Sequence, residues 1–252
     1  MKFPVTSAAM AVLLAACGGS PIEPEKSRGD NAAAINVQLG YAYLQQGNLA
    51  LAKEKFERAE TQNPRDPNVH SALAILYERL GKTTEVDQHF RTALRLAPHN
   101  PEISNNYAVY LCRNGRTEEG LRRFRAVAED PLYRTPDSAY TNAGVCLRNA
   151  GRLDDAEANF KQALLLRPNS AEAAYQFSDL QFTRGRVKDA RIQVDQYLAA
   201  FDATPELLLL GVRAAHALGD RLAAERYARR LRVEFPGSAQ VRAIPRLDQN
   251  PG

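Results

Sequence analysis

The cysteines are the residues with the most distinctive chemistry in this sequence, because the chain has only three. Cys112 and Cys146 lie 34 residues apart, and Cys17 stands near the N-terminus. None of them forms a Cys-x-x-Cys pair, the spacing typical of local zinc and redox sites. What the distant pair does therefore depends on the compartment and on the elements that carry the two thiols.

The remaining groups that could perform catalysis or bind metal show no supporting pattern. No His-x-x-x-His pair, Gly-rich phosphate loop or Gly-x-Ser-x-Gly turn occurs among the 252 residues. The neighbouring carboxylates Glu118-Glu119 and Asp154-Asp155 stand where helices are expected to begin, and a helix N-terminus favours negative charge. The sequence therefore predicts no enzyme, no cofactor and no metal site. The histidines are His70, His89, His99 and His216.

Regularly spaced glycines indicate what positions these residues. The separations between them are 34, 34, 36, 34 and 34 residues, for Gly47, Gly81, Gly115, Gly151, Gly185 and Gly219. Four prolines follow the same spacing, namely Pro64, Pro98, Pro168 and Pro236. A period of 34 resembles the tetratricopeptide repeat, which has small residues in both helices, a Phe in the second helix and a closing Pro.

The predicted fold class is all-α, a tetratricopeptide-repeat solenoid of six helix-turn-helix units. The units are placed at 33–66, 67–100, 101–136, 137–170, 171–204 and 205–238, and residues 239–252 form a C-terminal tail. Each unit is two antiparallel helices joined at the glycine, which takes a positive φ without a Cβ penalty. One helix pair cannot cover its own apolar face, so neighbours stack and leave a concave groove. The Tyr and Phe stripe is predicted to be core rather than a cofactor site.

The N-terminus predicts export and lipid attachment. Residues 1–16 have one Lys and a short apolar run, the pattern of a signal peptide rather than a membrane span. Leu14-Ala15-Ala16-Cys17 resembles a bacterial lipobox, in which the cysteine is acylated; a plain signal peptide is the alternative. Gly18 then favours the outer membrane. Residues 17–32 comprise this cysteine and a flexible tether rich in Gly, Pro and charge.

Export makes a disulfide between Cys112 and Cys146 the favoured prediction. Cys112 is position 12 of its unit and Cys146 is position 10 of the next. Two positions along a helix rotate a side chain by about 200°, which suits residues on opposed faces of adjacent first helices. Disulfides persist in oxidising compartments, and one that closes 34 residues stabilises a fold by roughly 3–4 kcal/mol. Two buried free thiols and a redox site are the alternatives.

The charge balance is mildly basic, since Lys and Arg exceed Asp and Glu by 33 − 29 = 4. The excess is concentrated near the C-terminus, where a basic surface could meet nucleic acid, anionic lipid or an acidic partner, or simply be a solvated helix face. We predict no nucleic-acid partner and no small-molecule substrate. The residues concerned are Arg221, Arg226, Arg229, Arg230, Arg232, Arg242 and Arg246.

Two Cys-bearing segments make the resemblance more specific. NNYAVYLCRNGR at 105–116 and DPLYRTPDSAYTNAGVCLRNAGR at 130–152, together with the lipobox and the repeats, resemble the type IV pilus biogenesis lipoproteins of the PilF/PilW group. This resemblance implies an outer-membrane pilotin, anchored to the inner leaflet and facing the periplasm. Its partner would be the pilus secretin, which it helps to localise and multimerise. Val86, in place of a small residue, and a degenerate sixth repeat depart from the pattern.

The groove is expected to bind the partner through the inner face of the first helices, mainly in repeats one to four. Tyr41, Ile75 and Val109 are predicted to form an apolar floor. Paired Asn side chains could bind a partner backbone or instead brace neighbouring helices. The full set of predicted partner-binding residues is Tyr41, Leu44, Ile75, Asn105, Val109, Asn142, Val145 and Arg148.

Two other functions are compatible with a lipid-anchored repeat protein. One is a periplasmic scaffold that regulates peptidoglycan enzymes, and the other is a subunit of an outer-membrane protein assembly machine. The repeats by themselves are shared by many scaffolds and do not separate these functions. Deleting the gene and following secretin multimers would separate them.

Overall fold

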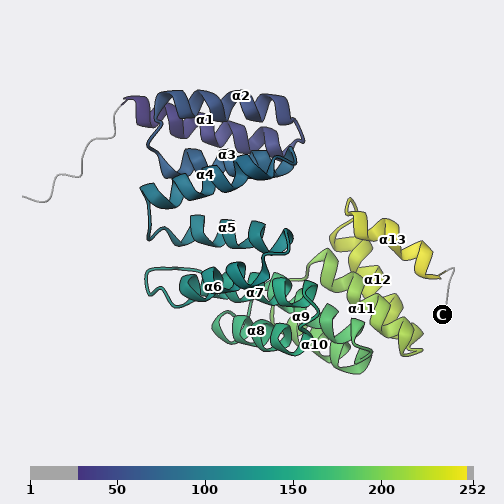
Figure 1. The fold of residues 1–252 in the computed structure, drawn as a ribbon. Coiled ribbons are helices and arrows are strands. Elements are labelled where there is room, and N and C mark those ends of the chain that lie inside the picture. Colours follow the sequence, from purple (N-terminus) through teal and green to yellow (C-terminus); the bar gives the residue numbers. More distant parts are fainter. Residues whose placement is uncertain (1–27, 249–252) are drawn as a thin grey trace, which may run out of the picture.

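The computed structural model describes residues 28–248 of the chain, which form helices throughout and contain no strand in this range (Figure 1). The all-α prediction is therefore confirmed. The helices are α1 (Arg28–Gln45), α2 (Leu49–Gln62), α3 (Pro67–Arg79), α4 (Thr83–Leu96), α5 (Pro101–Arg113), α6 (Thr117–Ala128), α7 (Pro136–Asn149), α8 (Leu153–Leu166), α9 (Ala171–Thr183), α10 (Val187–Ala200), α11 (Pro205–Ala217), α12 (Arg221–Glu234) and α13 (Ala239–Asp248).

Six helix pairs follow one another in chain order, and the periodic glycines make the turn within each pair. All six have φ between 71° and 76°, a conformation that other residues adopt only with strain. Proline opens several first helices, where its missing N–H costs nothing, and side chains such as Asn100 cap them. The turns within the pairs and the starts of several first helices are thus encoded locally.

Small residues let the two helices of a repeat approach closely. A Cβ atom on Gly144 of α7 would lie 2.5 Å from Cε1 of Phe160 in α8, and one on Gly40 would lie 2.3 Å from the same atom of Phe56. Both phenylalanine rings are fully buried. The glycine and the aromatic ring therefore form one packing unit, which recurs along the chain.

The stack curves because its two layers of helices are packed differently. First helices of neighbouring repeats contact one another, from α1 with α3 through to α9 with α11. In the described part of the chain no two successive second helices make such contacts. Helices inside a curved stack lie closer together than those outside it, so the first helices line the concave face.

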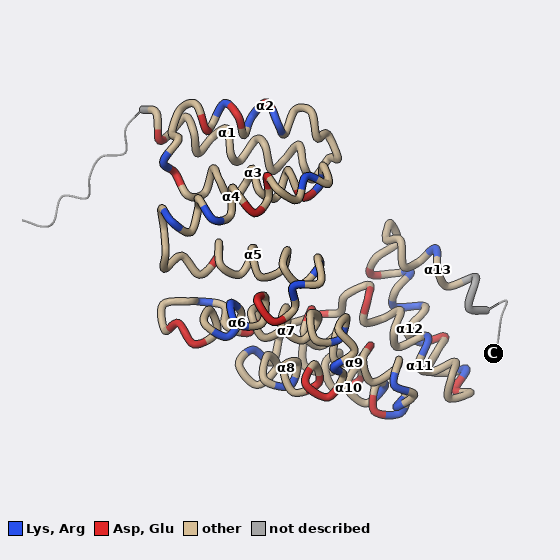
Figure 2. The backbone as a smooth tube through the Cα atoms, in the orientation of Figure 1, with Lys and Arg blue, Asp and Glu red and all other residues tan. Residues whose placement is uncertain are grey.

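Charged residues are also distributed differently between the first and the second helices (Figure 2). α5 carries only Glu102 and Arg113, whereas α12 is dense in arginine. On the outer side, an arginine directly after a turn glycine pairs with a carboxylate of the preceding second helix. The pairs are Arg116 with Asp87 at 2.8 Å, Arg152 with Glu118 at 2.9 Å, and Arg186 with Glu157. These ion pairs bridge helices that do not pack directly.

Glu157 shows the electrostatic balance within these bridges. Burial raises the pKa of its carboxyl, but hydrogen bonds from Lys161 and Arg186 outweigh burial and lower the pKa to about 2. Lys161 lies 2.8 Å away on the same helix, and Arg184 lies 3.1 Å away after α9. The carboxylate is therefore charged at neutral pH and joins the fourth repeat to the fifth.

Both ends of the repeat array differ from the sequence-based prediction. α1 begins at Arg28, so residues 28–32 are helical rather than part of the flexible tether. At the other end, the predicted tail contains α13, which packs on α11 and α12. Ile244 of α13 is buried in the core that those helices form. The last repeat would otherwise expose an apolar face, and α13 covers it.

Within residues 28–248, none of the helices combines the length and the apolar character that a membrane-spanning helix needs.

Candidate functional site

A pocket of about 250 Å³ opens on the concave face, between the first helices of repeats three, four and five. Its wall is formed by α5, α7 and α9, and the ring of Phe124 from α6 closes its base. The lining residues are Val109, Cys112, Arg113, Phe124, Asn142, Val145, Cys146, Asn149, Glu172 and Gln176. Three of the residues predicted to bind a partner therefore meet in one cavity.

A disulfide forms part of this wall. Cys112 of α5 and Cys146 of α7 are joined, with Cα atoms 5.5 Å apart, which is the pairing predicted from their helical positions. Gly120 of α6 makes room for it, because a Cβ there would lie 2.4 Å from the sulfur of Cys112. The bridge fixes the spacing of α5 and α7 and so the width of the pocket at this point.

The two asparagines predicted for the groove contact each other. The side-chain amide of Asn142 donates a hydrogen bond to Oδ1 of Asn105, at 3.2 Å, and so connects α7 to α5. Asn142 also lines the pocket, whereas Asn105 does not. The structure thus supports the bracing alternative for the pair and leaves Asn142 partly available to a ligand.

Gln176 of α9 is a polar residue of the pocket wall, and the two polar atoms of its side chain differ in their hydrogen bonding. Its amide nitrogen donates to Glu172 at 2.7 Å. Its oxygen Oε1 is buried and has no hydrogen-bond partner within the described part of the chain. A buried acceptor without a partner is costly and is usually satisfied by water or a ligand donor. Because Oε1 is shielded from solvent, the Gln176 side chain would have to rotate before this oxygen could accept from a ligand in the pocket.

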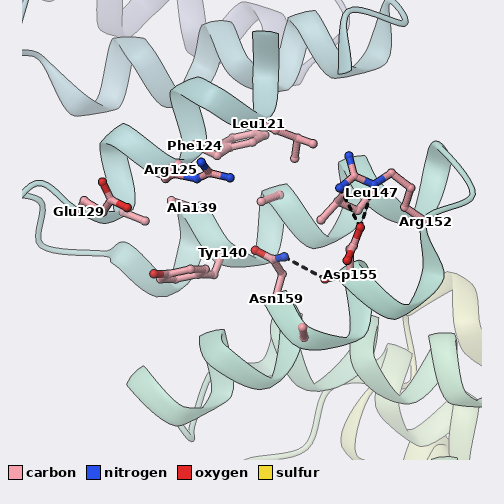
Figure 3. Close-up of a pocket in the computed structure, with 13 residues that line it drawn as sticks. Leu121, Phe124, Arg125, Glu129, Ala139, Tyr140, Leu147, Arg152, Asp155 and Asn159 are labelled. Carbon is pink, nitrogen blue, oxygen red and sulfur yellow. Dashed lines mark hydrogen bonds and ion pairs between the residues drawn. The ribbon is translucent and has the colours of Figure 1, made fainter. Parts of the chain in front are cut away.

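A second pocket, of about 330 Å³, lies between α6, α7 and α8 (Figure 3). Some of its polar groups have partners inside the protein. Arg152 pairs with Asp155 at 2.7 Å, and the side chain of Asn159 donates to the backbone oxygen of Asp155 at 2.9 Å. Arg125, Glu129 and Tyr140 add further polar side chains to the lining of this pocket.

Comparisons with known proteins agree with this architecture. Family models of the tetratricopeptide repeat match residues 69–103 and 147–213, and a TPR repeat model matches residues 40–81. The type IV pilus assembly protein PilF of Pseudomonas aeruginosa is 29% identical over 221 residues, which cover 88% of this chain and 87% of PilF.

Two solved structures extend the likeness to the fold. A structure described as a functional characterisation of Pseudomonas aeruginosa pilF has a TM-score of 0.65 at 28% identity and covers 87% of this chain and 99% of its own. The structure of PilW, described as a widely conserved type IV pilus biogenesis factor, has a TM-score of 0.66 at 29% identity and covers 84% and 98%. This chain is a PilF/PilW-like tetratricopeptide-repeat protein.

In this PilF/PilW-like protein, the remaining residues predicted for the groove lie outside the pocket. Tyr41 and Leu44 on α1 and Ile75 on α3 are half-buried and pack against the cores of the first two repeats. The Tyr41 ring meets Phe56 with centroids 5.3 Å apart, and burial raises the pKa of the Tyr41 hydroxyl to about 12. Of the predicted floor of Tyr41, Ile75 and Val109, only Val109 lines the pocket, and a partner-binding role for the other two stays a prediction.

Arg148 is engaged elsewhere on the concave face. Its guanidinium lies 3.3 Å from Asp179 of α9, and Arg213 of α11 reaches the same carboxyl group at 3.6 Å. This ion-pair cluster lies beside the pocket and links repeats four, five and six. Arg148 thus braces the inner layer rather than lining the cavity.

Sequence reasoning missed four pocket residues, which are Arg113, Asn149, Glu172 and Gln176. The sequence contains a signal for these residues, because residues four apart on a helix share a face and so can line the same cavity. Arg113 follows Val109 by four positions, Asn149 follows Val145 in the same way, and Glu172 and Gln176 are similarly spaced. The lipidation site predicted at Cys17 lies outside the described residues.

Proposed function

We propose that this protein is an outer-membrane lipoprotein pilotin, which binds the type IV pilus secretin and is needed for its localisation and multimerisation. The PilF/PilW likeness over most of the chain supports a role in pilus biogenesis. The lipobox-like Leu14–Cys17 segment supports a lipid anchor that faces the periplasm. In this proposal the solenoid is a binding scaffold and performs no catalysis.

The observation that carries the proposal is the chemistry of the concave pocket. Val109, Val145 and the disulfide give it an apolar base, while Asn142, Asn149 and Gln176 supply side-chain amides. An amide side chain can both donate to and accept from a peptide group, and Asn149 is exposed at the pocket. We infer that the pocket binds a peptide segment of the secretin that carries a small apolar side chain.

Filling the concave pocket should stop secretin assembly. Asn149 is exposed and lines the pocket, so Asn149→Trp places an indole in the binding space without disturbing the core. We expect loss of secretin multimers, measured by immunoblot of membranes from a strain in which the only copy of the gene for this protein carries the substitution. Circular dichroism of the purified variant should show unchanged helix content.

The matched control fills the other pocket. Asn159→Trp introduces the same ring into the pocket of Figure 3, and we expect normal multimers. The reverse pattern would place the binding face between α6 and α8. Normal multimers in both variants would exclude either pocket from secretin assembly.

Anchoring should depend on Cys17. Cys17→Ser removes the thiol that would be acylated, and several acyl chains are needed for stable membrane attachment. We expect the variant to leave the outer-membrane fraction and to be recovered as soluble protein, as judged by membrane fractionation with marker proteins. Retention of the Cys17→Ser protein in the outer membrane would mean that the lipobox interpretation is incorrect.

A further inference from the structure

Three potential metal ligands meet where the first repeat packs on the second. Glu60 lies on α2, His70 near the start of α3 and His89 on α4. One ligand atom from each residue can be chosen so that all three lie within 4.8 Å of one another. These residues, the Glu60–His70–His89 cluster, are far from the concave pocket in sequence and belong to other helices.

The distances within the cluster match those of a tetrahedral zinc site. The Nδ1 atoms of His70 and His89 are 3.2 Å apart, and Oε1 of Glu60 is 3.6 Å from Nδ1 of His70. Two imidazole nitrogens bound to one tetrahedral zinc ion at about 2.0–2.1 Å lie about 3.4 Å apart. All three ligand atoms lie within 4.8 Å of one another, so side-chain rotation would bring them to the separations of a tetrahedral site.

A hydrogen bond outside the cluster sets the tautomer of His70. Its Nε2 lies 2.9 Å from the carbonyl oxygen of Pro64, which can only accept, so Nε2 carries the proton and donates. Nδ1 of the neutral ring is then left with a lone pair that faces His89 and Glu60. Metal-binding histidines commonly use their second nitrogen in this way, which orients the ring.

The surroundings shield the cluster from water. His70 is only 7% exposed, and the ring of His89 stacks on Tyr77 with centroids 5.3 Å apart. The carboxylate of Glu60 would attract a cation bound between the two rings.

We propose that the Glu60–His70–His89 cluster binds one Zn²⁺ ion through Oε1 of Glu60 and the two Nδ1 atoms. Two imidazoles and a carboxylate are a ligand set that zinc accepts, and its fourth position would be taken by water. Because the ligands come from α2, α3 and α4, the ion would brace the first repeat against the second. Without metal, Nδ1–H of His89 donates to Nδ1 of His70, which keeps the same arrangement.

Calorimetric titration of the metal-stripped full chain with ZnCl₂ tests the site. A Cys17→Ser background leaves no free thiol to compete, since Cys112 and Cys146 are bridged. We expect one Zn²⁺ per chain with micromolar or tighter affinity, and a rise in melting temperature on saturation. Co²⁺ in place of Zn²⁺ should give the visible absorption bands of a tetrahedral site.

Three substitutions and one matched control assign the ligands. His89→Gln and Glu60→Gln alter half-buried positions and should each weaken Zn²⁺ binding at least tenfold, a loss of about 1.4 kcal/mol or more. His70→Gln should do the same, although its burial also makes it the variant most prone to unfold. His99→Gln changes an exposed histidine outside the cluster and should bind as the parent does. Absence of binding up to millimolar Zn²⁺, or equal affinity in the folded His89→Gln protein, would overturn the proposal.

Discussion

Removing the disulfide should lower the free energy of unfolding by about 3–4 kcal/mol. The variant replaces both Cys112 and Cys146 by alanine, so that neither sulfur is left as a buried free thiol. The bridge closes a separation of 34 residues and thereby restricts the unfolded chain. Urea denaturation followed by circular dichroism measures the loss.

Two observations make this result interpretable. The wild-type protein unfolded in the presence of dithiothreitol should reach the stability of the double variant, because both lack the bridge. The variant should also retain the helix content of the wild type, because Gly120 already provides space around the sulfur of Cys112. A loss below about 1 kcal/mol would mean that the stacked repeats alone determine the spacing of α5 and α7.

Truncating a fully buried ring should destabilise the fold to a similar extent. Phe160 is 0% exposed and lies against Gly144 of the facing helix. Phe160→Ala removes this contact and leaves a cavity that Gly144 cannot fill. We therefore expect the free energy of unfolding to fall by about 3–5 kcal/mol. Chemical denaturation monitored by circular dichroism measures it.

Phe201→Ala is the matched control, since this ring is 36% exposed at the end of α10. This substitution should lower the free energy of unfolding by less than about 1.5 kcal/mol, because part of the ring's apolar surface is already in water. Equal losses at the two positions would show that the ring between α7 and α8 is not a principal packing contact of the fourth repeat.

The repeat architecture could be predicted from the sequence because its signals are local and recur. Each turn glycine must take a positive φ, and the six observed values confirm the six turns. Gly144 and Phe160 recur at the positions where two helices must approach, so the pairing of helices follows from spacing alone. The relation of Cys112 to Cys146 is equally simple, because their positions differ by two residues, which turns the two side chains toward each other from adjacent first helices.

Other features depended on the three-dimensional stack. α13 has no repeat pattern, and its role arises from the apolar face that the last repeat leaves uncovered. Tyr41 and Ile75 of the predicted floor pack beside the cores of the first repeats, whereas the cavity forms where α5, α7 and α9 meet. The cavity depends on the curvature of the stack, which no single repeat encodes.

The Glu60–His70–His89 cluster shows most clearly how local sequence signals differ from features that need the tertiary structure. Glu60, His70 and His89 are separated by 10 and 19 residues, so no short spacing motif connects them. The sequence determined the helices on which they lie, the periodic turns of those helices and the disulfide between repeats three and four. Only the packing of α2 against α3 and α4 brought the three side chains together, because the distance between residues on different helices is set by tertiary contacts and not by their spacing along the chain.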